Sequence, residues 1–355
     1  MTKTKTKRLL HIFAWIMAIL ALYAVVSYVV TVVVISGYFK RQEPAKYSFY
    51  LYYEDIAENY PRELLRFSSG ENQLQGYLYG AGNSAGLIVQ AHGFGSCANG
   101  YTAETKYFVD HGYQVFSYDN TGCDKSEGEN MVGLCQGVLD LDAALTYIEG
   151  ESRFSGLPVF LYGHSWGGYA VSAIFHFQHN ITASASLAGF SYPQEVIMDW
   201  GKDLVGSFVY SIYPATAVYQ HILFGKNAKI NAVDAINSTD TPILLLHGTQ
   251  DTSVDFDSSA TVNHRDALTN PNVKVWIIDT EKKNDHSHLN KDLDAVCYME
   301  QLNERLDAMK KQYDGEIPED VAEHFYASVD KERASKLDEN VMQTILDFYQ
   351  AAIQN

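Results

Sequence analysis

Short apolar runs that end in glycine alternate with helical segments over residues 86–189 of this chain. "GLIVQAHG" (86–93) and "LPVFLYG" (157–163) have the continuous apolar character of strands buried on both faces of a sheet. Apolar residues at helical spacing follow each such run. The expected strands are 86–93, 113–119, 157–163 and 181–189, and the expected helices are 100–112, 137–150 and 169–177. This α/β order predicts a mostly parallel sheet with helices on both faces.

The pattern changes on either side of this region. Residues 64–80 read as two short strands around a turn at 69–72, and 43–62 as a Tyr-rich connector. Residues 190–240 are aromatic with weak periodicity, which predicts an inserted helical cap. Strands at 241–251 and 273–279 then resume the sheet, and 300–355 has a helical pattern. The folded domain is therefore expected to span 63–355.

The composition supports a globular body. Of 355 residues, 46% are hydrophobic and 19% charged, which is unlike a disordered chain. The formal net charge is -17, and no basic stripe is visible. A nucleic-acid partner is therefore not expected.

The N-terminus carries an apolar run from Leu9 to Phe39 without Asp, Glu, Lys or Arg. A helix needs about 20 apolar residues to cross a bilayer, and this run is longer. The apolar region of a cleaved signal peptide is shorter, and no clear A-x-A site follows. Residues 1–42 are therefore predicted to form a short cytoplasmic tail and one retained transmembrane helix, with a cleaved signal as the alternative.

Basic residues flank the run unequally. They are Lys3, Lys5, Lys7 and Arg8 before it, and Lys40, Arg41 and Lys46 after it. Because positive flanks stay cytoplasmic, this small excess favours a single-pass protein of the cell membrane with its folded domain outside. The four cysteines show no metal or disulfide spacing pattern. A bridge between Cys123 and Cys135 stays open.

"GHSWG" (163–167) matches the G-x-S-x-G pattern. An expected strand precedes Ser165 and an expected helix follows it, which is the context in which such a serine is a nucleophile. Small flanking residues permit the sharp turn that exposes the hydroxyl. The alternative is a structural glycine-rich turn.

A nucleophilic serine needs a base and an acid that orients the base. Asp251 follows "ILLLHGTQ" at the carboxyl end of the expected strand 241–251, at the sheet edge where functional groups gather. Asp255 and Asp257 are rivals further from the strand, and a capping role is the alternative for Asp251. His247, near the strand's end, is expected to support the acid's loop.

The base is expected in "DTEKKNDHSHLN", which follows the last strand. His286 is favoured because it lies on a loop before a helix expected to start near 287–290, and His288 is the alternative.

Two backbone N–H groups are expected to hold the oxyanion. Trp166 follows the nucleophile, and Phe94 lies in "AHGFGS", where His92 is expected to brace the loop. No Cys/His spacing suggests a metal, and no cofactor is implied.

The motifs "HGFG", "GHSWGG" and "HGTQD" resemble those of the α/β-hydrolase superfamily, in its serine-hydrolase branch with esterase-like and aminopeptidase-like (S33/S9-like) members. The resemblance runs from about residue 64 to the C-terminus. Its implication is an α/β-hydrolase fold. "DNTGCDKSEG" (119–128) departs from the family's D-x-R-G-x-G-x-S-x-G loop, since Thr121 replaces an arginine and Asp124 a glycine. A "KKND" lead also replaces the usual glycine-rich approach to the histidine.

These features predict a membrane-anchored serine hydrolase. Ser165 would attack an ester or small peptide amide, His286 would carry the proton, and Asp251 would orient the imidazole. The aromatic residues of the cap suggest an apolar acyl group, or they only pack the cap. The alternative is an inactive binding protein on the same scaffold. The oligomeric state is not predicted.

Overall fold

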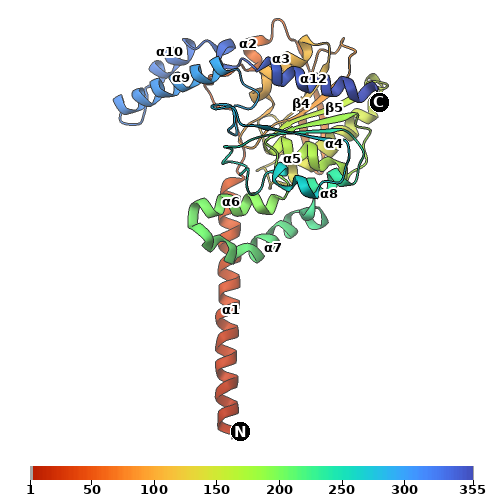
Figure 1. Cartoon of the computed structure of the whole chain (residues 1–355). Coiled ribbons are helices and arrows are strands. Elements are labelled where there is room, and N and C mark those ends of the chain that lie inside the picture. The colour runs from red at the N-terminus through yellow and green to blue at the C-terminus, as the bar shows by residue number, and fades with distance from the viewer. Residues whose placement is uncertain (1–2, 355) are drawn as a thin grey trace.

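The computed structural model describes residues 3–354, and its centre is one eight-stranded sheet (Figure 1). The strands are β1 (Arg62–Ser69), β2 (Asn72–Tyr79), β3 (Leu87–Ala91), β4 (Gln114–Tyr118), β5 (Val159–His164), β6 (Ala183–Leu187), β7 (Ile243–Gly248) and β8 (Val273–Ile278). Their order is β1-β2-β4-β3-β5-β6-β7-β8. β1 and β2 pair antiparallel, β2 pairs antiparallel with β4, and all other pairs are parallel. The predicted mostly parallel sheet is confirmed.

Helices cover both faces of the sheet, as the alternation predicts. Leu87 and Val89 of β3 belong to the apolar core under α4 (Gln136–Gly150) and α5 (Trp166–Ala173). Ile88 points to the opposite core, where α3 (Thr102–Asp110) and α12 (Glu339–Gln354) pack. Because successive strand residues face opposite sides, the fully apolar run at 87–89 serves both cores.

Helices also fill the predicted cap between β6 and β7. They are α6 (Pro193–Val205), α7 (Tyr213–Phe224) and α8 (Ala232–Asn237), with 3₁₀ turns η4 (Gly206–Ile212) and η5 (Gly225–Lys229) between them. α6 and α7 lie beside α1 (Lys3–Tyr38), below the sheet in Figure 1. We call the segment Pro193–Lys229 the cap.

The helix expected to begin near 287–290 is an error of the sequence prediction. The Asp285 carboxylate accepts the backbone N–H groups of Ser287 (2.9 Å) and His288 (3.0 Å), which closes a turn there instead. The helix begins at Leu293, after Asp292 caps it. The C-terminal helices are α9 (Leu293–Gln312), α10 (Glu319–Ala327), α11 (Lys331–Ala334) and α12.

α1 has two parts with different surroundings. It is long and apolar enough to cross a membrane, by length and composition, over Lys5–Tyr38. Every residue of 5–26 is exposed. Beyond them Ser27, Thr31, Ile35 and Phe39 are buried at intervals of four, which is one stripe along the helix and the residue that follows it. This stripe packs on the domain.

The residues that follow α1 are held to the domain by hydrogen bonds. The Arg41 guanidinium donates to the carbonyls of Asp124, Ser126 (3.0 Å) and Gly128 (2.9 Å). The Gln42 N–H donates to the Gly122 carbonyl at 2.9 Å. The segment expected as a connector then contains α2 (Tyr53–Ile56).

Two of the sequence predictions concern the chain ends and the cysteines. Met1 and Thr2 of the predicted 1–42 unit, and Asn355 of the predicted 63–355 domain, lie outside the described residues. Cys123 and Cys135, whose pairing the sequence left open, are free thiols, as are Cys97 and Cys297.

Candidate active site

Ser165 lies at the turn between β5 and α5, with φ 58° and ψ -117°. A left-handed φ is strained for serine, and this strain is typical of a nucleophile held on a strand-to-helix turn. The Ser165 N–H donates to the Leu187 carbonyl at 2.8 Å. A Cβ at Gly163 would collide with the Gly167 carbonyl, and one at Gly167 with the Ala91 carbonyl. Glycine is therefore required on both sides.

The structure brings Ser165, His286 and Asp251 into one hydrogen-bonded chain. His286 Nε2 is 2.8 Å from Ser165 Oγ, and His286 Nδ1 is 2.7 Å from Asp251 Oδ2. Because the carboxylate can only accept, Nδ1–H donates to it and Nε2 is left to accept the serine proton. His288 is placed elsewhere, with its Nδ1 2.7 Å from Asp285 Oδ2.

Asp251 is buried at the carboxyl end of β7. Its Oδ1 accepts the N–H groups of Ser253 and Val254, both at 2.9 Å, and His247 Nε2 lies 3.1 Å from its Oδ2. Burial alone would raise the pKa of Asp251, but the hydrogen bonds from His247 and His286 outweigh it and hold the pKa well below the usual range. The carboxylate therefore stays ionised beside the imidazole.

The rival acids are placed differently. Asp255 accepts the N–H of Asp257 at 2.9 Å and so closes its own turn. His247, which the sequence associated with the acid's loop, also lies 3.0 Å from the Val254 carbonyl. It thus contacts both the acid and the loop that follows it.

Two backbone N–H groups without an acceptor among the described residues belong to residues that line the cavity of Ser165. Phe94 and Trp166 line the same cavity as Ser165. Within residues 3–354, no acceptor takes either backbone N–H. A Cβ on Gly93 would lie 3.4 Å from Ser165 Cβ, so the strand end passes close to the serine. These positions suit an oxyanion hole.

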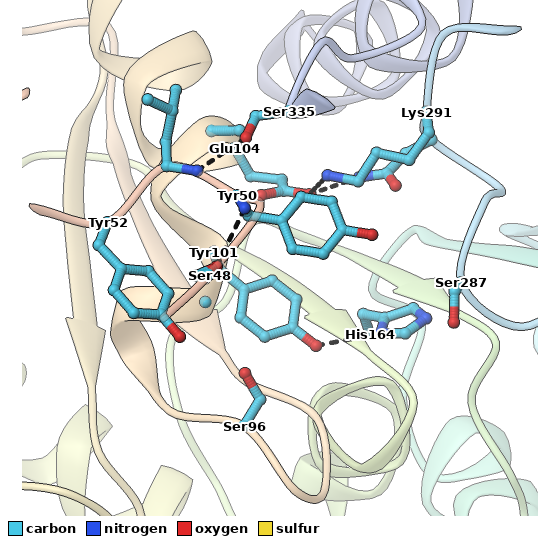
Figure 2. A pocket seen from close by; sticks show the side chains of 14 residues that line it. Ser48, Tyr50, Tyr52, Ser96, Tyr101, Glu104, His164, Ser287, Lys291 and Ser335 are labelled. Atoms are coloured by element: carbon cyan, nitrogen blue, oxygen red, sulfur yellow. Dashed lines mark hydrogen bonds and ion pairs between the residues drawn. The ribbon is translucent and has the colours of Figure 1, made fainter. Parts of the chain in front are cut away.

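A hydrogen-bonded relay that the sequence analysis missed joins the three loops of the site. The Gly93 N–H donates to Tyr101 Oη (2.9 Å), whose hydroxyl donates to His164 Nδ1 (3.0 Å); Figure 2 shows the latter pair. His164 Nε2–H donates to the His286 carbonyl at 2.7 Å. Burial, helped by nearby His286, lowers the pKa of His164 to about 4, so the ring is neutral. The relay fixes the backbone of the expected base relative to the serine.

The segment after His288 is also held in place. The buried Glu104 carboxylate accepts from Asn290 Nδ2 (2.8 Å) and pairs with Lys291 Nζ (3.2 Å). Figure 2 shows Glu104 and Lys291 at a pocket that Tyr101 and His164 also line and that does not include Ser165. Burial opposes ionisation of Glu104, but the Lys291 charge and the hydrogen bonds to the carboxylate together outweigh it, and the net effect is a lowered pKa. The histidine loop is thus tied to α3.

His92 braces the loop that carries Phe94, as predicted. Its Nδ1–H donates to the Gly93 carbonyl at 2.9 Å, and its Nε2 accepts the Asn120 N–H at 3.0 Å. Complete burial lowers the pKa of His92 to about 4. The ring is neutral in this role and is not the base.

The loop 119–128 is a brace as well. Thr121 donates through its N–H (2.7 Å) and hydroxyl (2.9 Å) to the buried Asp140 carboxylate. Asp124, where the family pattern has glycine, takes a positive φ of 37°. None of residues 119–128 is among the described residues that line the cavity of Ser165. The geometry therefore favours a supporting role for this loop over a contact with substrate.

One group of side chains near this loop has metal-like spacing but unsuitable chemistry. Ligand atoms of Cys97, Asp119 and Asp124 lie within 4.8 Å of one another. Asp119 already accepts from Tyr77 Oη (2.7 Å) and the Ala98 N–H (2.9 Å). Burial raises the pKa of Asp119 to about 6 and that of Cys97 to about 12, so the thiol stays protonated. A protonated thiol is a poor ligand.

The cavity at Ser165 has a volume of about 550 Å³, within the range of small-molecule sites. Apolar side chains dominate one side of it. They are Tyr38, Phe94, Leu134, Phe190, Trp200 and Leu204. Of the cap aromatics, Trp200 thus lines the cavity, whereas Phe224 is buried in packing and Tyr219 contacts α1. Trp200 therefore stays a candidate contact for an acyl group, whereas Phe224 and Tyr219 serve packing.

Part of the chain matches a known family. Residues 82–235 match Hydrolase_4, described as serine aminopeptidase, S33. This stretch contains Phe94, Ser165 and Trp166 but ends before Asp251 and His286.

Two curated relatives are similar over shorter stretches. The chain is 34% identical to the monoglyceride lipase of Homo sapiens over 26% of its own length, and 33% identical to a monoglyceride lipase homolog of monkeypox virus over 23%. These matches span about 30% of the relatives' lengths.

Solved structures share the fold. An esterase of Pyrococcus furiosus superposes with a TM-score of 0.54 at 17% sequence identity, covering 77% of this chain and 98% of the esterase. At this identity the likeness concerns architecture alone.

Proposed function

Because this chain belongs to the α/β-hydrolase superfamily, in its serine aminopeptidase S33 branch, we propose that it is a serine hydrolase that cleaves a carboxylic ester through an acyl-enzyme. The observation that carries this proposal is the chain of hydrogen bonds from Ser165 through His286 to Asp251. Each group in it has the partner that acyl transfer requires.

The reaction follows from the hydrogen-bond directions. Ser165 Oγ forms a bond to the ester carbonyl carbon as its proton passes to His286 Nε2, and Asp251 stabilises the resulting imidazolium. The N–H groups of Phe94 and Trp166 hold the oxyanion. The tetrahedral intermediate then collapses, the C–O bond to the alcohol breaks, and His286 returns the proton to that oxygen. Water repeats the sequence on the acyl-enzyme and releases the acid.

An ester is favoured over a peptide amide. The apolar side of the cavity suits a hydrocarbon acyl group, and the curated relatives are named as lipases. The matched family is described as an aminopeptidase, so aminoacyl amides belong in the same substrate panel. We expect turnover of acyl esters and much slower turnover of amides.

A fluorophosphonate probe tests the hydrolase proposal directly. The wild-type protein should be labelled, and Ser165→Ala should abolish both labelling and ester turnover. Ser328→Ala is a matched control, because this serine caps α10 far from the site. A folded, unlabelled wild-type protein without ester turnover would instead support the inactive binding protein.

We also propose that α1 anchors the protein in the cell membrane with the domain outside. The length and composition of α1 and the basic excess before it support this orientation. Retention in the membrane fraction at alkaline pH, together with digestion of the domain by protease added to intact cells, is expected. Complete protection from the protease would contradict the orientation.

A further inference from the structure

We propose that the groove between α1 and the cap holds the acyl chain of a membrane lipid ester, which reaches Ser165 from the bilayer rather than from water. This inference names the substrate class of the proposed hydrolase, and it rests on that function and on the membrane anchor. Four features carry it: the groove's walls, its continuity with the serine cavity, its depth, and the surface around it.

α1 forms one wall of the groove, and the cap forms the other. Thr31, Val34 and Ile35 of α1 form one wall, and Met198 and Phe208 of the cap lie opposite. Its volume is about 170 Å³, and its lining is almost entirely apolar. A hydrocarbon chain is the ligand such a surface favours.

The groove continues into the cavity of Ser165. Tyr38, Trp200 and Leu204 line both spaces. The Tyr38 and Trp200 rings stack with centroids 6.3 Å apart, and Trp200 lies 5.5 Å from the ring of Phe94. An ester carbonyl placed at Ser165 can therefore direct its acyl chain past Trp200 towards α1.

The cap reaches down to the expected membrane level. A bilayer core needs about 20 helical residues, so a span that starts at Leu9 ends near residue 29. Tyr23 Oη nevertheless donates to Ser211 Oγ of the cap at 2.7 Å. At about 1.5 Å per residue, that contact lies roughly 9 Å inside the end of the span. The lower end of the cap is thus beside lipid, and the groove begins at Val30, directly above the end of the span.

The surface of the cap is unusually apolar. Among residues 39–354, seven of the twelve exposed large apolar side chains lie in the cap. They are Leu204, Val205, Phe208, Tyr210, Tyr213, Val218 and Ile222. A concentration of exposed apolar side chains in one segment marks a contact with protein or membrane. Because it lies beside the exposed stretch of α1, lipid is its neighbour, and a lipid chain is the occupant that we assign.

Photocrosslinking tests the groove without requiring turnover. The full chain carrying Ser165→Ala is placed in phosphatidylcholine vesicles with a palmitoyl ester that bears a diazirine at the end of its chain. We expect adducts in residues 30–39 and 197–212. Adducts confined to 5–26, the stretch exposed to any lipid, would overturn the proposal.

A charge in the groove wall tests its use in catalysis. Val205→Asp changes an exposed groove residue and should lower the ratio of kcat/KM for p-nitrophenyl palmitate to that for p-nitrophenyl butyrate about tenfold. Leu293→Asp, an exposed leucine outside the groove, should leave the ratio unchanged. An unchanged ratio in Val205→Asp would overturn the role in catalysis. Groove adducts without turnover of any ester would instead refute the hydrolase and keep the lipid site.

Discussion

Two groups of residues around Ser165 are held together in different ways. The first, which we call the polar wall, is the hydrogen-bonded set His286, Asp251, His164 and Tyr101, joined at 2.7–3.0 Å, of which His286 lines the cavity. The second, which we call the apolar wall, is formed by α1 and the cap, which meet through aromatic and aliphatic contacts. Hydrogen bonds fix direction as well as distance, whereas apolar contacts are non-directional.

This difference separates two tasks. In the proposed hydrolase, the polar wall would determine whether a proton can move from Ser165, so small errors there should cost much activity. The apolar wall would determine which acyl group is held and from where it arrives, so changes there should alter preference more than the chemical step. The predictions below test this separation, from the largest expected effect to the smallest.

Removing the base should have the largest effect. His286→Ala is expected to lower kcat by about 10⁵- to 10⁶-fold, as loss of a triad histidine does in serine hydrolases. His288→Ala should change kcat less than threefold, because His288 pairs with Asp285 rather than with Ser165. Steady-state hydrolysis of p-nitrophenyl butyrate measures both. A larger loss in His288→Ala would reverse the assignment.

Neutralising the acid should have the second-largest effect on activity. Asp251→Asn is expected to lower kcat by about 10⁴-fold, because an amide donates towards His286 Nδ1 and favours the wrong tautomer. The matched control is Asp255→Asn, which alters the neighbouring acid that bonds only its own turn. Equal losses in the two variants would reject Asp251 as the orienting acid.

Acidification should lower the free energy of unfolding through the buried residues His92 and His164. His92 and His164 are neutral when folded, with pKa values lowered to about 4 by burial, whereas unfolded histidine titrates near 6.5. Between these values the unfolded chain binds more protons, so the free energy of unfolding should fall as pH drops from 6.5 to 4. Each histidine contributes about 3 kcal/mol to this fall.

Unfolding in detergent, followed across this pH range, measures that loss. His92→Asn should be less stable at pH 7 and should show a shallower decline below pH 6.5. Constant stability between pH 6.5 and 4 would contradict the neutral, buried histidines.

The smallest effect is expected from the apolar wall. Trp200→Ala removes the ring between Tyr38 and Phe94, and should raise KM for a long-chain ester about fivefold, or roughly 1 kcal/mol of lost apolar contact. The loss in kcat should be smaller than the change in KM. A loss confined to kcat would show that Trp200 serves the chemical step and would break the separation between the walls.

Much of the fold was predictable from local patterns. Apolar runs that end in glycine predict the strands around "LIVQA" and "VFLYG". The position of Ser165 between a strand and a helix indicates a nucleophile. The order of Ser165, Asp251 and His286 along the chain also suggested their meeting at one sheet edge.

Other features depend on contacts between distant segments. His164 occupies the variable position of G-x-S-x-G, and nothing local signals that it meets Tyr101 and the His286 carbonyl. The turn at Asp285 replaced an expected helical start, because a side-chain cap competed with helix formation. The burial of Thr31 and Ile35 is likewise invisible in a run that is apolar on every side.

The clamp formed by Arg41 has a consequence for how this protein would encounter substrate. Three carbonyls hold its guanidinium, so the connection between α1 and the domain is rigid and not flexible. If α1 anchors the protein as proposed, the domain would keep a fixed distance and a fixed orientation relative to the membrane surface. Its reaction rate would then follow the mole fraction of substrate in the surface rather than its bulk concentration, and diluting the substrate with inert lipid would slow it even when the total amount is constant.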